Sequence, residues 1–202
     1  MGTHETSNKD EWNLNTTRIT DIDGTKSSEL TKASIEGRKQ TRKIYKVLKD
    51  HVPGFENAKM MGTGSVIGIR ETRHIKGKYI IEKEDLLQMR TFDEDVLLCS
   101  NAIDIHFNES SAREYIVIDK WYGIPYRSLV ALNCKNILVA GKAISATSEA
   151  GSAFRVMPCC FGTGQAAGTA AAITVFDKVN PNKVDVYKLQ HTLISQDVFL
   201  NK

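Results

Sequence analysis

The sequence predicts a mixed α/β fold, and three features of its 202 residues point to it. Residues 136–141 (NILVAG) form a short, fully apolar run that ends in glycine, which is typical of a strand buried on both faces. Residues from Cys159 to about Phe176 are rich in alanine and glycine, which predicts a helix packed very close to a neighbour. Residues 101–107 and 114–118 are apolar-rich and predict two further strands.

The N-terminal part of the chain predicts a short strand and one long helix. Residues 12–19 alternate as a strand does, and Ser27, Ser28 or Thr31 is suited to begin the helix. A Val-Pro-Gly sequence at 52–54 is expected to end it. Lysine and arginine crowd one face of this helix between residues 32 and 50. Nucleic-acid binding through that face is a distant alternative, because such a run of basic residues is usually the solvated face of an amphipathic helix.

The middle and the C-terminal end predict smaller elements. Val66, Ile67 and Ile69 are strand-like, and Tyr79–Ile81 is a second short apolar run. Residues 84–89 predict a short helix. Residues 121–130 form a proline-containing loop or strand edge, residues 145–155 are small and polar, and 185–195 predict a last amphipathic helix.

Composition narrows the function classes. A formal charge of +3, from 27 basic and 24 acidic residues, does not suggest a dedicated nucleic-acid binder. The most apolar window, residues 166–176, is too short to span a bilayer, and residues 1–12 have no apolar core of a secretory signal. We therefore expect a cytoplasmic protein that contacts neither membrane nor nucleic acid.

The four cysteines form no CxxC pair and have no histidine cluster, so no metal site is expected. Cys159 and Cys160 are adjacent, but a disulfide between neighbours is strained. At a helix start both thiols would have a lowered pKa. A redox-active thiol is one interpretation, although the surrounding sequence offers no partner thiol; four reduced, mostly buried thiols is the plainer one.

Residues 124–173 carry a series of motifs that resembles one family. PYRSL is followed by a strand ending in AG, an ISAT loop, R-V-M-P and a G-Q-A-A-G-T-A-A helix. Earlier stretches, LTKASIEGRKQ, VPGFENAKM, GIRETRHIKGKYI and IDIH, follow the same order. Over about residues 12–195 the chain thus resembles the C-terminal part of the FAD-dependent oxidoreductase family.

The resemblance implies the C-terminal portion of a Rossmann-like FAD/NAD(P)-binding flavoprotein with an α+β substrate-side region. Residues 1–20 and 120–202 would form a partial FAD-binding region, and 21–119 the middle region. The G-x-G-x-x-G unit that holds the ADP half of FAD is missing from this sequence. Gly162-x-Gly164-x-x-x-Gly168 does not replace it, because its spacing differs and no strand leads into it.

The expected cofactor site is the start of the alanine-rich helix. Free backbone N–H groups there would stabilise the negative charge that a reduced flavin ring gathers, and a proline fits the first turn. By resemblance, the end of the NILVAG strand lies under the ribityl and diphosphate region; Lys142 stands where the family often has arginine. The candidate cofactor residues are Gly141, Lys142, Ser145, Arg155, Val156, Met157, Pro158, Cys159, Gly164 and Gln165.

Candidates for the substrate side are Arg70, Arg73 and His106. The arginines could clamp an anion and the histidine could relay a proton. Ion pairs of the arginines with Glu71 or Asp104, and a purely structural histidine, are the open alternatives. Arg155 could bind a cofactor phosphate or pair with Glu149.

The sequence is compatible with two functions. The first is the C-terminal part of an FAD-dependent oxidoreductase that contributes the flavin-ring side of the site for hydride or electron transfer. The second is a folded, non-catalytic fragment or remnant that cannot hold FAD alone. A homo-oligomer, or a partner chain that supplies the missing FAD-binding half, would fit either, because the NILVAG strand lacks its neighbours.

Overall fold

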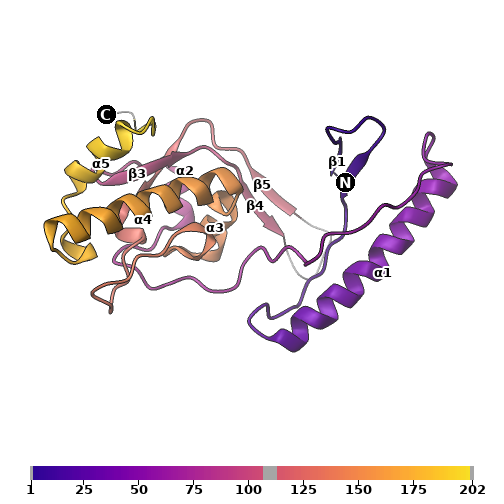
Figure 1. The fold of residues 1–202 in the computed structure, drawn as a ribbon, viewed down its shortest axis with the longest axis horizontal. Helices are drawn as coiled ribbons and strands as arrows, with labels where there is room; N and C mark the ends of the chain where they lie inside the picture. Colours follow the sequence, from indigo (N-terminus) through magenta and orange to yellow (C-terminus); the bar gives the residue numbers. More distant parts are fainter. Residues whose placement is uncertain (1, 107–112, 201–202) are drawn as a thin grey trace. The chain divides into compact units, whose positions relative to one another are not determined.

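The computed structural model describes residues 2–106 and 113–200 and has a mixed α/β fold (Figure 1). The chain divides into two compact units, residues 1–69 and residues 70–202. Each unit is described by itself below. The predicted functional division into 1–20 with 120–202 and 21–119 stays a prediction.

The first unit contains a hairpin and a long helix. Strands β1 (Gly2–Glu5) and β2 (Trp12–Asn15) pair antiparallel, and α1 runs over Ser27–His51. The helix begins close to the predicted residues and ends at the predicted Val-Pro-Gly sequence, but its N-cap is Lys26, without a side-chain cap hydrogen bond, rather than Ser27, Ser28 or Thr31. The predicted strand over 12–19 was too long, since β2 ends at Asn15.

Helix α1 buries a narrow stripe of its surface. Ala33, Gly37 and Leu48 are buried, at intervals that place them on one side of the helix. The side chain of Gln40 accepts a hydrogen bond from the backbone N–H of Arg18 at 3.1 Å. Val47 is 54% exposed, although it stands next to the buried Leu48.

The second unit is built on two antiparallel strand pairs and four helices. Strand β3 (Asp95–Cys99) pairs with β6 (Tyr122–Pro125), and β4 (Ile103–His106) pairs with β5 (Arg113–Ile116). The helices are α2 (Lys83–Leu87), α3 (Ser148–Phe154), α4 (Met157–Asp177) and α5 (Val186–Ile194). Short 3-10 turns, η1 (Tyr126–Ser128), η2 (Gly141–Ala143) and η3 (Pro181–Lys183), join them.

Helix α4 packs against several other elements of the second unit. It packs against β3 and α5 and lies beside α5 in Figure 1. The backbone comes so close to β3 that a Cβ at Gly162 would lie 2.6 Å from a methyl of Leu97. Glycine at this position therefore permits the contact between helix and strand. The helix start at Met157 and its end at Asp177 agree with the alanine-rich pattern.

The NILVAG segment departs from the prediction. Residues 136–140 are not in a named strand; Leu138 makes one isolated bridge to Val130, and Ile137 is 44% exposed. The predicted strand buried on both faces is therefore wrong for this chain. The physical reason is that a strand requires neighbours on its edges to satisfy its backbone, and among the described residues this segment finds one bridge only.

Two other expectations also failed. Val66, Ile67 and Ile69 do not lie in a strand of this described stretch, and within Tyr79–Ile81 only Ile81 makes a bridge, to Ala146. Helix α3 was not predicted, because its small polar sequence has little helical periodicity. Thr147 begins it: the side chain accepts a hydrogen bond from the backbone N–H of Ala150.

Candidate functional site

The first turn of α4 begins at the surface, where Met157 and Pro158 are exposed. Val156 precedes the helix in an extended conformation, and its side chain makes no capping hydrogen bond in the described structure. Pro158 occupies the first turn, where its missing N–H costs nothing. Met157 is 72% exposed. This end of the helix therefore carries a partial positive charge that no side chain of its own cap neutralises.

Gly141 is connected to this turn by hydrogen bonds through the Thr163 hydroxyl. Its backbone N–H donates to the Thr163 hydroxyl at 2.9 Å, and that hydroxyl donates to the backbone carbonyl oxygen of Cys159 at 3.0 Å. Gly141 has a φ of 70°, which a residue with a side chain rarely adopts. The pKa of the Cys160 thiol is raised by burial, an effect that the nearby Lys142 opposes. The structure thus brings Gly141, Lys142 and the start of α4 together.

One side of α4 is exposed along its whole length, although the helix is apolar. We call this the outer face of α4; it comprises Met157, Phe161, Gly164, Gly168 and Val175. Phe161 is 72% and Val175 is 75% exposed. A Cβ added at Gly164 or Gly168 would meet nothing within 4 Å. The opposite side, with Cys159, Thr163, Ala166 and Ala170, is buried.

Glu71, His74 and Arg155 form a charged network next to the residues that precede α4. Nδ1 of His74 is 2.8 Å from the backbone oxygen of Ile144, and its Nε2 is 3.0 Å from the Glu71 carboxylate. Glu71 also accepts a hydrogen bond from Ser148 at 3.0 Å and pairs with Arg155 at 3.4 Å. The hydrogen bond with Glu71 raises the pKa of His74, and the same bond lowers the pKa of Glu71.

The predicted substrate-side residues differ in their surroundings. Arg70 pairs with Asp104 at 3.2 Å, which was the open alternative for it, while Arg73 is exposed. The backbone of His106 ends β4, and its side chain lies outside the described part of the structure. Arg155 pairs with Glu71 rather than with Glu149, and it also donates to the backbone oxygen of Asp104 at 3.1 Å.

The remaining candidates divide between surface and core. The Gln165 amide donates to the side chain of Gln196 at 3.0 Å and is exposed. Ser145 is fully buried against Gly77, and its hydroxyl has no hydrogen-bond partner among the described residues. A contact of Ser145 with a cofactor stays a prediction.

Comparison with known protein families matches residues 3–193 to the family described as FAD dependent oxidoreductase. The chain belongs to that family. No curated protein and no solved structure matches the chain. FAD dependence and a mixed α/β fold follow from the family and the structure together. In residues 2–106 and 113–200 no group of metal-ligating side chains gathers, and no helix is long and apolar enough to cross a membrane.

The residues of this FAD dependent oxidoreductase fit the ring end of a flavin. The first turn of α4 offers backbone donors, the adjoining outer face offers apolar surface, and the glycines on it leave open space. A flat, largely apolar ring that becomes negative on reduction needs these three properties.

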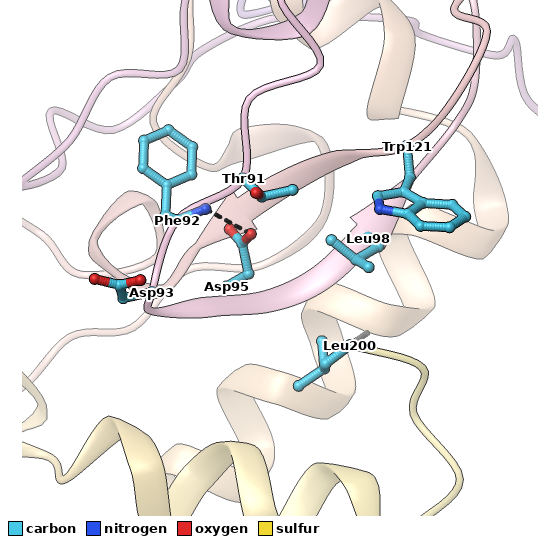
Figure 2. A pocket seen from close by; sticks show the side chains of 7 residues that line it. All are labelled: Thr91, Phe92, Asp93, Asp95, Leu98, Trp121 and Leu200. Atoms are coloured by element: carbon cyan, nitrogen blue, oxygen red, sulfur yellow. Dashed lines mark hydrogen bonds between the residues drawn. The ribbon is translucent and has the colours of Figure 1, made fainter. Parts of the chain in front are cut away.

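A cavity lies elsewhere on the second unit, away from the outer face of α4. A cavity of about 160 Å³ is lined by Thr91, Phe92, Asp93, Asp95, Leu98, Trp121 and Leu200. Figure 2 shows the backbone N–H of Phe92 donating to the buried Asp95 carboxylate, at 2.8 Å. Leu98 alternates with Leu97, which contacts α4, so its side chain points to the other side of β3. This cavity is therefore separate from the start of α4.

Sequence reasoning missed three members of the site. Glu71 and His74 stand three residues apart within the quoted GIRETRHIKGKYI stretch, and that spacing was a usable signal. Thr163 lay within the G-T-G run that was weighed only for its glycines. Its hydroxyl connects Gly141 to α4 across 22 positions, which no local pattern reveals.

Proposed function

We propose that the chain forms the flavin-ring side of an FAD-dependent oxidoreductase, with the ring against the first turn and the outer face of α4. The carrying observation is an exposed helix start without a side-chain cap that continues into exposed apolar surface. Bound FAD would supply the hydride or electron transfer. The protein would bind the ring, orient it and stabilise charge at one edge of it.

The residues at the helix start would have distinct tasks. The backbone from Val156 to Cys159, with Met157 and Pro158, would face the ring edge that gains negative charge. Gly141 would allow the backbone to approach the cofactor, and Lys142 would contribute a positive charge next to it. Gly164 would leave room for the ring on the outer face, with Gln165 at its rim.

The Glu71–His74–Arg155 network would position rather than react. It fixes the backbone oxygen of Ile144, three residues beyond Gly141, through the 2.8 Å contact of His74. Arg155 is bound to Glu71 and to the backbone of Asp104, so it would order the chain that enters α4. Arg70, Arg73 and His106 remain the proposed substrate-side residues.

The ADP half of FAD would be held from outside residues 1–202, because the sequence has no G-x-G-x-x-G unit. A Rossmann-like unit, on the same polypeptide or on a partner chain, would then also cover the outer face of α4. A homo-oligomer is the competing way to cover it. In this proposal residues 1–20 and 120–202 serve the cofactor and 21–119 the substrate.

The second candidate is a folded, non-catalytic fragment that does not hold FAD. The NILVAG segment favours it, because a segment that makes one isolated bridge in the described structure is a poor support for a cofactor.

Titrations with three flavins distinguish the flavin-ring site from the non-catalytic fragment. Riboflavin, FMN and FAD are titrated into the chain and flavin fluorescence is measured, with ADP as competitor. A ring-side site quenches all three flavins with similar midpoints, and ADP does not compete. Competition by ADP would contradict the proposal, and no quenching by any flavin would favour the non-catalytic fragment.

Two matched variants locate the binding. Phe161→Ala removes an aromatic ring that is 72% exposed on the outer face of α4, and Tyr187→Ala removes one that is 69% exposed on α5. We expect Phe161→Ala to raise the riboflavin midpoint several-fold, because stacking area is lost, and Tyr187→Ala to leave it unchanged. An equal effect of both variants would place the flavin elsewhere.

A further inference from the structure

Two cysteines 60 positions apart meet where α4 packs on β3. The contact point is Gly162 on the helix against Leu97 on the strand. Cys159 lies three residues before Gly162 and so on the same face of α4. Cys99 lies two residues after Leu97 and so on the same side of β3. The helical and strand periods therefore direct both thiols into one interface.

Both thiols are buried there and share polar surroundings. Cys99 and Cys159 are each 4% exposed. The Cys159 thiol donates to the Asn101 side-chain oxygen at 3.5 Å. Tyr122, the cross-strand partner of Cys99, donates from its hydroxyl to the backbone oxygen of Asn101 at 3.4 Å. Asn101 thus contacts Cys159 through its side chain and Tyr122, the neighbour of Cys99, through its backbone.

The two thiols differ in acidity. A hydrogen bond between them raises the pKa of Cys99 and lowers the pKa of Cys159. The Cys159 sulfur is therefore the better nucleophile of the pair, since the thiolate is the reacting form.

We propose that Cys99 and Cys159 are a redox-active pair that converts between a dithiol and a disulfide. The co-reactant is a low-molecular-weight disulfide such as oxidised glutathione. When the contact between α4 and β3 opens locally, the Cys159 thiolate attacks one of its sulfurs and releases one glutathione thiolate. Cys99 then loses its proton and attacks the Cys159 sulfur, which releases the second. Two protein thiols are oxidised and one glutathione disulfide is reduced to two thiols.

The other two cysteines are not suited to this reaction. Cys134 is exposed and lies on the segment before NILVAG. The Cys160 sulfur is 4.0 Å from the backbone oxygen of Phe154. A disulfide between Cys159 and Cys160 would demand a strained geometry inside the first turn of α4. The inference does not depend on flavin binding.

Disulfide mapping of the full chain tests the pair. The chain is equilibrated with oxidised and reduced glutathione, quenched in acid, alkylated and digested with trypsin without reduction. Cys99 falls in the peptide 91–113, and Cys159 with Cys160 in the peptide 156–178. We expect a cross-link between these peptides within one chain, reversed by excess reduced glutathione.

The variant Cys160→Ser makes the assignment unique, because Cys159 is then the one cysteine left in its peptide. We expect the cross-link to persist in Cys160→Ser and in Cys134→Ser and to disappear in Cys159→Ser. Loss of the cross-link in Cys160→Ser would overturn the proposal. So would four alkylated thiols at every glutathione ratio, glutathione adducts without a cross-link, or a cross-link between two chains.

Discussion

The two long helices, α1 and α4, expose opposite kinds of surface. The 25 residues of α1 bury a narrow stripe and present lysine and arginine to water. The 21 residues of α4 carry one charged side chain, Asp177 at the last position, and expose phenylalanine, valine and glycine instead. A helix that is apolar all round is typical of a buried position. The basic face of α1 is thus suited to water, and the exposed apolar face of α4 supports the proposal that a cofactor or a second layer covers it.

The largest contrast is expected between two phenylalanines. Phe154, at the end of α3, is 2% exposed, and Phe154→Ala should destabilise the chain by about 3–5 kcal/mol through loss of burial and a cavity. Phe161→Ala, on the outer face of α4, should change stability by about 0.5 kcal/mol or less. Urea unfolding measures both. Equal losses would mean that the outer face is already packed.

Two glycines two residues apart on α4, and so on different sides of the helix, sharpen the same contrast. Gly162→Ala should cost about 1–3 kcal/mol, because its Cβ would press on Leu97. Gly164→Ala should stabilise by up to about 1 kcal/mol, since the site is open and alanine is the better helix former. The sign of the change in the unfolding midpoint is the measurement. A gain for Gly162→Ala would refute the close contact with β3.

The anchor of Gly141 is expected to have an intermediate effect. Thr163→Val keeps the shape of the side chain but leaves the Gly141 N–H without its acceptor, at a cost of about 1–2 kcal/mol. Thr163→Ser retains the hydroxyl and is the control. Amide exchange at Gly141, followed by NMR, should accelerate in the valine variant only.

The smallest effect is a dependence on pH through the Glu71–His74 pair. His74 has a raised pKa, so its contribution to stability is present below the ordinary value of about 6.5 and is lost as the pH rises through the folded value. The contribution of Glu71, with its lowered pKa, is present above its ordinary value of about 4.3 and is lost in acid. Between these two limits the pair is most stabilising. His74→Gln should flatten the urea midpoint between pH 6 and 8; an unchanged profile would exclude the pair as its cause.

Local signals in the sequence predicted the two long helices but not α3. The Val-Pro-Gly sequence at 52–54 predicted the end of α1, although its N-cap is Lys26 rather than a serine or threonine, and the alanine-glycine run with its leading proline predicted α4. These features act within one turn, so they hold whatever the rest of the chain does. The motif series also predicted the family that the comparison confirmed.

What depended on distant residues could not be predicted. Residues 136–141 have the composition of a buried strand, but strand pairing needs neighbours that a local pattern does not contain. The contact of Cys99 with Cys159 and the anchor between Gly141 and Thr163 both arise where α4 meets other elements. For the site, the sequence indicated the start of α4 but not the Glu71–His74 pair behind it.

Methionine oxidation tests the central proposal about α4 most directly. Met157 at the start of α4 is 72% exposed, and Met61 in the first unit, at 86%, is the internal control. Dilute hydrogen peroxide is applied in the dark with and without saturating riboflavin, and sulfoxide formation at each site is followed by mass spectrometry. The proposal predicts that riboflavin slows oxidation of Met157 and leaves Met61 unchanged. Unaltered oxidation of Met157 while riboflavin fluorescence is quenched would contradict it.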